Sequence, residues 1–340
     1  MRTREGFPGW AGASLQVSPA ERFPVFAVTR TRRMADDHSP STQDSSRACP
    51  DLLFRHVDML AGVIGPRYPG NRGTMAATAG YIEGQLKALG LTVARETYDI
   101  NGESVHNLVV NIPGTHLPND IVILGAHYDS TPTTPGADDN GSAVAVLIET
   151  ARLLKDIIPR RSIRFVAFAC EESPYFHTGE MGSMIHAQGC VERRENVVAM
   201  LCLEMVGYFV DGENSQQVPP AIPKWLRRLF PSRGNFLAAV ANPRSWKLCW
   251  QFRRGFKKAT RFPLFSIVLP ERIPEIHLSD HRSFWQHGFP ALMLTDTSFL
   301  RNPNYHQWTD TADTLDYNRM AQVTLGVVSA VRRISGASGS

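Results

Sequence analysis

Two histidines and a set of acidic residues could together hold metal ions, although they are spread over about half of the chain. They are His127, Asp138, Glu171, Glu172, Glu204 and His306. Short apolar runs at residues 121–126, 163–170 and 197–203 are each followed directly by one of them. Such runs are typical of buried strands, and functional groups gather outside the carboxyl ends of the strands in an open α/β sheet. Imidazoles and carboxylates without cysteine suit a hydrolytic zinc centre better than a structural one.

The string His127-Tyr128-Asp129 indicates how the first imidazole is held. Asp129 lies two residues from the imidazole, so its carboxylate can orient His127 as a ligand. A single acid or histidine at a strand end is more often a surface or hydrogen-bonding group. We favour that simpler interpretation for Asp129, Glu149 and His177 when each is taken alone.

The acids in the middle of the chain indicate two further roles. Asp138 lies in a turn-rich string, PGADDNGS, that opens onto an apolar helix-like stretch at residues 143–154, where a carboxylate is well placed to bridge two cations. The pair Glu171 and Glu172 can supply one ligand and one free carboxylate, which a metal-activated water needs as its proton acceptor. Paired acids after a run as apolar as residues 165–170 are costly without a partner, which favours the metal-binding interpretation for the whole set.

Six strings in this order resemble the M28 zinc peptidases, a family that includes bacterial aminopeptidases. The resemblance covers roughly residues 50 to 330, and the matching strings are GAHYDS (125–130), PGADDNGS (135–142), ACEES (169–173), CLEMVGY (202–208), SDHRSFWQHGFPAL (279–292) and NYHQWTDTADTL (304–315). Any one of them would be a weak signal, but six in sequence make a strong one.

The resemblance implies a site with two zinc ions per chain. Asp138 would bridge the ions, and the other ligands would be His127 and Glu204 on one ion and Glu172 and His306 on the other. Glu171 would be the general base, and we place Asp129 with it in the catalytic set as the carboxylate that orients His127. Many family members have Asp at the position of Glu204. Asp280 resembles an acid that supports the ligands in the family, although a helix-capping role is equally open.

Two functions of different classes follow. The first is a zinc metallopeptidase, most simply an aminopeptidase that acts on short peptides with a free N-terminus. The second is a relative such as a glutaminyl cyclase, which shares the fold and a similar SDH string but uses a single zinc ion as an acyltransferase. A catalytically silent family member is a further alternative. The complete set of five ligands favours the peptidase, because a one-zinc enzyme does not require all five.

The order of apolar runs and helical periods predicts the fold class. We expect one helix to begin near Asp51 and further helices at residues 74–89, 143–154, 182–187 and 318–334. We expect strands at residues 91–98, 106–112, 121–126, 163–170, 197–203 and 291–294. Alternating strands and helices predict an α/β three-layer sandwich, with a mixed, largely parallel central sheet flanked by helices. The resemblance implies the same, zinc exopeptidase-like fold.

Composition and length set the limits of the domain organisation. The chain has 340 residues, of which 43% are hydrophobic and 20% charged, and it contains no apolar stretch long enough to span a membrane. We expect a single catalytic domain at residues 49–334, a disordered or adventitious segment at 1–48 and a flexible tail at 335–340. No standard signal peptide is visible and the five cysteines show no close pairing, so we expect a reducing, cytoplasmic setting. We also expect no nucleic-acid partner.

A basic segment at residues 214–270 differs from the rest of the chain. It holds eleven Lys or Arg and no Asp or Glu, and we expect it to be an insertion that caps the site. Within it, residues 244–259 (RSWKLCWQFRRGFKKA) can form a basic amphipathic helix suited to a membrane surface or an acidic partner. The interpretation that we favour is packing of its aromatic side chains within the protein, with the charges in solvent.

Overall fold

The computed structural model describes residues 47–71, 73–220, 222 and 227–337, and the structural statements below concern these residues. One mixed sheet holds all eight strands in the order β1-β2-β4-β3-β5-β8-β6-β7. The strands are β1 (Val93–Ile100), β2 (Glu103–Ile112), β3 (Leu117–His127), β4 (Arg161–Phe168), β5 (Asn196–Glu204), β6 (Leu237–Ala241), β7 (Leu264–Val268) and β8 (Ala291–Thr295).

The centre of the sheet is parallel and both of its faces are covered. β4, β3, β5 and β8 lie side by side and parallel, whereas β1, β2 and β6 add antiparallel pairs towards the edges. Nearly every residue of β4 and β5 is buried, as expected for parallel strands between two layers of helices. The parallel pairing brings the carboxyl ends of β3, β4 and β5 to the same edge.

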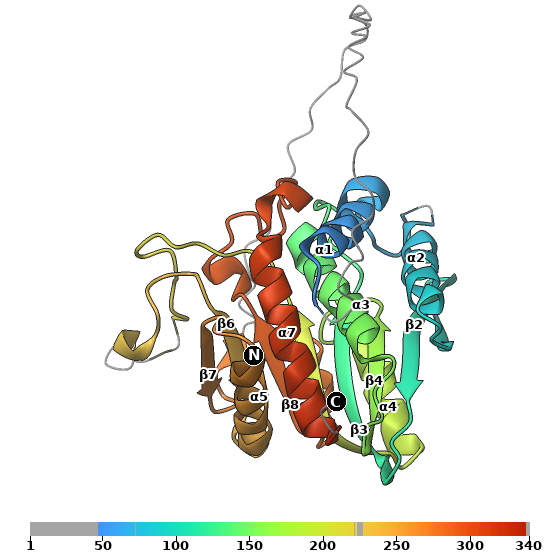
Figure 1. The fold of residues 1–340 in the computed structure, drawn as a ribbon. Helices are drawn as coiled ribbons and strands as arrows, with labels where there is room; N and C mark the ends of the chain where they lie inside the picture. Colours follow the sequence, from blue (N-terminus) through green and yellow to red (C-terminus); the bar gives the residue numbers. More distant parts are fainter. Residues whose placement is uncertain (1–46, 72, 221, 223–226, 338–340) are drawn as a thin grey trace, which may run out of the picture. The chain divides into compact units, whose positions relative to one another are not determined.

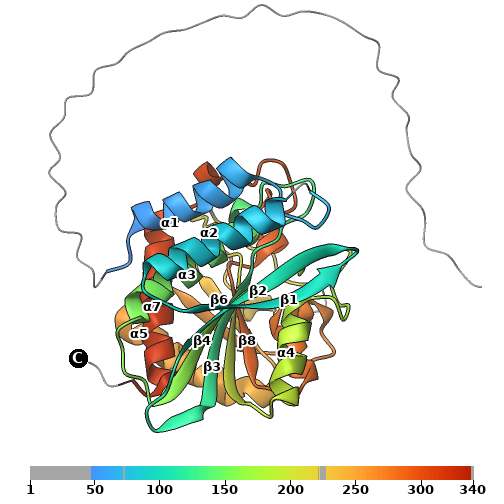
Figure 2. The same cartoon turned by 90° about the vertical axis from the view of Figure 1, so that its right-hand side faces the viewer.

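Helices cover the two faces of the sheet unequally (Figure 1). Figure 2 shows α3, α5 and α7 on one side and α4 on the other. The helices are α1 (Pro50–Val57), α2 (Thr74–Ala88), α3 (Ala143–Leu154), α4 (Gly182–Glu192), α5 (Trp246–Ala259), α6 (His281–Gln286) and α7 (Tyr317–Ser335). α3 is buried on nearly all sides because it packs against the sheet, α1, α2 and α7 at once.

The expected α/β three-layer sandwich with a mixed, largely parallel sheet is therefore confirmed. The helix expected at residues 143–154 has the expected bounds, and most other expected elements differ by a few residues at their ends. The last helix continues through Ser335, which is buried, so that residue does not belong to a flexible tail. The expectation for residues 1–46 and 338–340 lies outside the described residues.

The basic segment is not a separate insertion over its whole length. Its residues 237–268 supply β6, α5 and β7, which are part of the sheet and of one helical layer. α5 packs on α7 and buries Cys249, Phe252 and Phe256, whereas Trp246 and Trp250 are about half exposed. The packing interpretation thus accounts for the inner side of α5, and contact of its outer side with a membrane surface or an acidic partner stays a prediction. Within the described residues, no helix combines the length and apolar character of a membrane span.

Candidate metal centre

Three neighbouring strands bring their carboxyl-terminal residues together. His127 is the last residue of β3 and Glu204 the last of β5, while Glu171 and Glu172 follow β4 after two intervening residues. His306 comes from the loop between β8 and α7. The sheet therefore fixes four of these side chains, and a loop adds the second imidazole.

Two groups of possible metal ligands share one carboxylate, that of Asp139. The first group is His127, Asp139 and Glu204, and the second is Asp139, Glu172 and His306. His127 Nε2 lies 3.2 Å from Glu204 Oε2 and 3.6 Å from Asp139 Oδ1. On the other side, His306 Nε2 lies 3.0 Å from Asp139 Oδ2 and 3.4 Å from Glu172 Oε1. One oxygen of Asp139 thus faces each imidazole.

The structure corrects the prediction for Asp138, which lies outside both groups. Its Oδ2 accepts a hydrogen bond from Asn302 Nδ2 at 2.7 Å, and its Oδ1 accepts one from Gly207 N at 3.0 Å. Burial and the nearby Asp296 raise the pKa of the Asp138 carboxyl well above its usual range. Asp138 therefore organises the loops behind the site, and Asp139 is the carboxylate that the two groups share. The two adjacent acids stand in one turn, and the sequence pattern does not show which of them faces the imidazoles.

Backbone contacts hold this turn in place. Gly136 has a φ of 67°, and a Cβ there would lie 2.4 Å from Asp139 O, so glycine is required for the chain to pass this point. The carboxylate of Asp310 accepts hydrogen bonds from the N–H groups of Asp138 at 2.9 Å and Asp139 at 3.2 Å. Arg67, which is fully buried, donates to the carbonyl oxygen of Gly136 at 2.8 Å. Asp310 lies in the string at residues 304–315 and Arg67 lies outside all six strings, and the sequence analysis assigned a supporting role to neither.

Asp129 is a buried supporting carboxylate. Its Oδ1 lies 3.4 Å from His127 Nδ1, consistent with orientation of the imidazole. The same carboxylate accepts hydrogen bonds from the N–H groups of Glu171 at 3.0 Å and Glu172 at 2.9 Å. The strand ends of β3 and β4 are thereby locked together. Asp129 is therefore a buried hydrogen-bonding group and not a surface one, and its role in orienting His127 stays a prediction.

Two residues of the SDH string also lie near the first group. Ser279 Oγ donates to Glu204 Oε2 at 2.6 Å and so fixes that carboxylate, a role that the sequence did not suggest. Asp280 is fully buried, and burial raises the pKa of its carboxyl to about 7. Its side chain makes no capping hydrogen bond to α6, so the capping interpretation is not supported.

The site carries more negative charge than its own residues can neutralise. Burial alone would lower the pKa of His127, but the carboxylates of Glu204 and Glu171 raise it well above its usual range. Burial alone would lower the pKa of His306, but the nearby Asp139 and Glu172 carboxylates raise it to about 10. Such a cluster favours bound cations.

Unpartnered buried atoms test whether a metal fits these residues. Among the described residues, the buried atoms without a hydrogen-bond partner include both ring nitrogens of His127, Asp139 Oδ1, Glu172 Oε1 and His306 Nε2. Buried polar atoms without partners are rare in native proteins. All of these except His127 Nδ1, which faces Asp129, belong to the two groups of possible ligands. Nitrogen and carboxylate ligands in groups of three are what catalytic zinc prefers. The residues of both groups therefore fit zinc.

Glu171 differs from the ligand candidates because it belongs to neither group. Its Oε2 lies 3.9 Å from His127 Nε2, and its side chain borders the adjacent cavity. Burial, with the neighbouring Glu204 and Glu172 carboxylates adding to it, raises the pKa of Glu171 well above its usual range. A carboxylate with a raised pKa beside a metal centre is suited to accept and return a proton.

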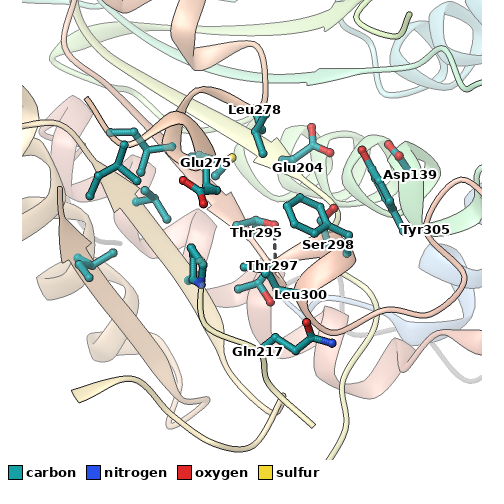
Figure 3. A pocket seen from close by; sticks show the side chains of 18 of the residues that line it. Asp139, Glu204, Gln217, Glu275, Leu278, Thr295, Thr297, Ser298, Leu300 and Tyr305 are labelled. Atoms are coloured by element: carbon teal, nitrogen blue, oxygen red, sulfur yellow. Dashed lines mark hydrogen bonds between the residues drawn. The ribbon is translucent and has the colours of Figure 1, made fainter. Parts of the chain in front are cut away.

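A cavity of about 210 Å³ opens beside the centre (Figure 3). Its metal-facing end includes Asp139, Glu204 and Tyr305, and the ring of Tyr305 stacks on His306 at 3.8 Å between centroids. The remaining wall is mainly apolar and includes side chains from β6, β7 and β8. Thr295 and Thr297 supply polar groups there, and Thr297 N donates to Thr295 Oγ1 at 2.9 Å.

The placement of the cavity corrects the expected basic cap. Ala238 and Val240 of β6 line it, whereas the alternate residues Leu237 and Ala239 face the layer that contains α5. The basic helix α5 therefore lies on the sheet face opposite the cavity. Gln216 and Phe230, from the first part of the segment, also line the cavity.

Sequence comparisons identify relatives over most of the chain. The model of Peptidase family M28 matches residues 107–331. The chain is 38% identical over 298 residues to Uncharacterized protein YfbL of Escherichia coli (strain K12), which covers 85% of this chain and 89% of that protein. It is 26% identical over 271 residues to Probable aminopeptidase YDR415C of Saccharomyces cerevisiae, covering 75% of this chain and 64% of that protein.

Solved structures share the fold at low sequence identity. BSAP, a zinc aminopeptidase from Bacillus subtilis, matches with a TM-score of 0.68 and 17% identity, covering 85% of this chain and 96% of that one. The glutaminyl cyclase of Fimbriiglobus ruber matches with a TM-score of 0.63 and 18% identity, covering 89% of this chain and 99% of that one. These similarities show the fold alone. One of the two solved structures is an aminopeptidase and the other a glutaminyl cyclase, so both activities considered from the sequence occur among proteins with this fold.

Proposed function

Because this chain belongs to peptidase family M28, we propose that it is a zinc-dependent aminopeptidase that removes N-terminal residues from short peptides. The observation that carries the proposal is the pair of three-residue groups joined by Asp139. His127 and Glu204 would complete one zinc site, and Glu172 and His306 the other. Zinc held there would polarise a carbonyl oxygen and lower the pKa of water towards neutrality.

Glu171 supplies the proton transfers in this proposal. Its carboxylate borders the cavity and belongs to neither ligand group, so it can accept a proton from water and pass it to the leaving amine. Asp129 accepts a hydrogen bond from Glu171 N and so positions the backbone of that residue. The raised pKa that burial gives Glu171 suits an acid–base group that must both take and return the proton.

The shape and lining of the cavity favour an exopeptidase. The cavity begins at the acidic centre, where a free α-amine can lie beside Glu204, Glu172 and Asp139. Its apolar wall then offers space for one substrate side chain. An N-acetylated peptide lacks the charged amine and loses the interaction with these carboxylates.

A glutaminyl cyclase-like activity is the alternative, since a protein of that kind has a similar fold. Such an enzyme would need one ion, whereas each group here contains buried atoms without a hydrogen-bond partner: His127 Nε2 in one, and Glu172 Oε1 and His306 Nε2 in the other. This difference favours the peptidase.

The test combines metal analysis with a substrate panel. We expect about two zinc ions per chain and hydrolysis of leucyl peptides with a free N-terminus, but not of their N-acetylated forms. A chelator should abolish hydrolysis, and added zinc should restore it. One ion per saturated chain together with cyclisation of N-terminal glutamine, and no hydrolysis, would replace the peptidase by the cyclase.

A further inference from the structure

The cavity beside the metal centre has an acidic residue in its apolar part. Its wall is built mainly by side chains such as Phe230, Phe236, Phe265, Ile267 and Leu269. Glu275, from the 3-10 turn between β7 and α6, borders the same space. In the view of Figure 3, Glu275 lies beyond Glu204 from Asp139, away from the residues that form the two metal groups.

One carboxylate oxygen of Glu275 has no partner. Its Oε2 is buried and makes no hydrogen bond within the described part of the chain. A buried carboxylate oxygen without a partner is costly, because it has lost water and gained nothing in exchange. The structure therefore places at this position a group that needs a donor, and preferably a positive charge.

The described residues that line the cavity offer no lysine or arginine to this carboxylate. The charged residues that line the cavity are Asp139, Glu171, Glu172, Glu204, Glu275 and His306, so neither Lys nor Arg is among the described lining residues. The metal ions of the proposed function would neutralise the acids at their own end of the cavity. Glu275 would remain as a negative charge in a largely apolar wall.

The chemistry of the partner follows from these two properties. A side chain that crosses the apolar part must have a hydrocarbon stem, and one that reaches Glu275 must end in a cation. Lysine and arginine combine such a stem with a charged end. A tyrosine hydroxyl could donate to the same oxygen, but it would leave the negative charge unbalanced.

We propose that Glu275 is the specificity residue of this site and selects substrates whose N-terminal residue is lysine or arginine. This proposal rests on the aminopeptidase function proposed above. The N-terminal amine would lie at the acidic end of the cavity, the stem of the side chain against the phenylalanines of the wall, and its charged end at Glu275. Leucine and methionine would fit the apolar part without using the carboxylate.

The test compares lysyl and norleucyl coumarylamides, because norleucine has a similar straight hydrocarbon stem without the charge. We expect the zinc-loaded wild type to have a kcat/KM at least tenfold higher for the lysyl substrate. Glu275→Gln should reduce this ratio by at least tenfold and leave hydrolysis of the leucyl substrate within about twofold of wild type. Glu275→Leu should reverse the preference. Glu180→Gln, which removes a charge from an exposed residue outside the cavity lining, should change none of these values.

Binding of the product amino acids gives a readout that does not depend on turnover. In calorimetric titrations, lysine should bind the wild type at least tenfold more tightly than norleucine, and Glu275→Gln should remove the difference. Equal kcat/KM values for lysyl and norleucyl substrates, or a preference for tyrosine over phenylalanine alone, would overturn the assignment while leaving the aminopeptidase intact. A wild type that hydrolyses no aminoacyl substrate but still prefers lysine in binding would overturn the proposed function and retain the pocket.

Discussion

Exchanging Asp139 or Asp138 for asparagine tests which of the two adjacent acids joins the metal groups. Asp139 presents one oxygen to each imidazole, at 3.6 Å from His127 Nε2 and 3.0 Å from His306 Nε2. Asp139→Asn removes the charge from a ligand of both groups. A lost interaction with a charged group costs roughly 1.5–3 kcal/mol, which corresponds to about 10- to 100-fold in affinity for each ion.

Asp138→Asn should have a different effect. Asp138 accepts hydrogen bonds from Asn302 and from the Gly207 N–H, and its two oxygens face these donors instead of the imidazoles. An amide at this position can accept only one of the two bonds, so we expect a loss of about 1–3 kcal/mol in the free energy of unfolding. At saturating zinc this variant should still hold two ions per chain.

Zinc content by mass spectrometry and competition titration with a chromophoric chelator measure both effects, and thermal unfolding of the metal-free proteins controls for stability. Asp139→Asn should bind both ions more weakly without a comparable loss of metal-free stability. The reasoning would be refuted by an Asp138→Asn protein that cannot be loaded with two ions while Asp139→Asn is loaded like the wild type.

Three further predictions concern the base, an ion pair and the packing of the helices. Glu171→Gln should keep the zinc content and lower kcat by about 10²- to 10⁴-fold, and a loss of zinc with activity proportional to reloading would instead make Glu171 a ligand. Burial alone would raise the pKa of Glu195, but bidentate hydrogen bonds from Arg164 lower it far below its usual range. The ion pair therefore stabilises the fold fully at pH values above the unfolded pKa of about 4.3, and this stability is lost as the pH falls towards the folded pKa. Denaturant titrations should therefore show Glu195→Gln about 2 kcal/mol less stable than wild type at pH 7 and a shrinking difference below pH ~4, and a difference independent of pH would exclude the ion pair as its cause. Gly255→Ala should destabilise by about 1–3 kcal/mol, because its Cβ would lie 2.5 Å from the α7 backbone, whereas the exposed helical control Gly84→Ala has open space and should gain up to ~1 kcal/mol.

The sequence predicted the parts of the site that regular strands position. His127 and Glu204 end their strands, and Glu171 and Glu172 follow β4 closely, so a correct estimate of the strand ends was enough to place them. The apolar runs before these residues are long and rich in branched or aromatic side chains, which is the pattern that indicates a buried strand most clearly.

The parts that the sequence did not predict depend on local backbone direction and on distant contacts. Two adjacent aspartates in a turn point different ways, and Asp310 and Gly136 help to hold the turn that separates them. β6 was missed because its alanine-rich LAAVA string has little intrinsic preference for a strand. β7 is a short LFSIV run that the sequence analysis took as part of the basic insertion. Their place in the sheet is set by pairing with β8 and with each other.

The same two missed strands determine what the cavity can recognise. β6 and β7 turn alternate residues towards the cavity and towards α5, so one basic segment supplies both an apolar wall and a solvated helix on the opposite face. The positive charges of α5 therefore lie across the sheet from Glu275, although they are close to it in sequence. A chain with a net charge of +4 thus contains a cavity whose lining is largely apolar and carries acidic side chains. The net charge of the whole sequence therefore does not indicate the charge of the residues that line a substrate cavity. The sign of the preferred side chain follows from Glu275 and the metal-facing acids, because these are the groups that line the space it must enter.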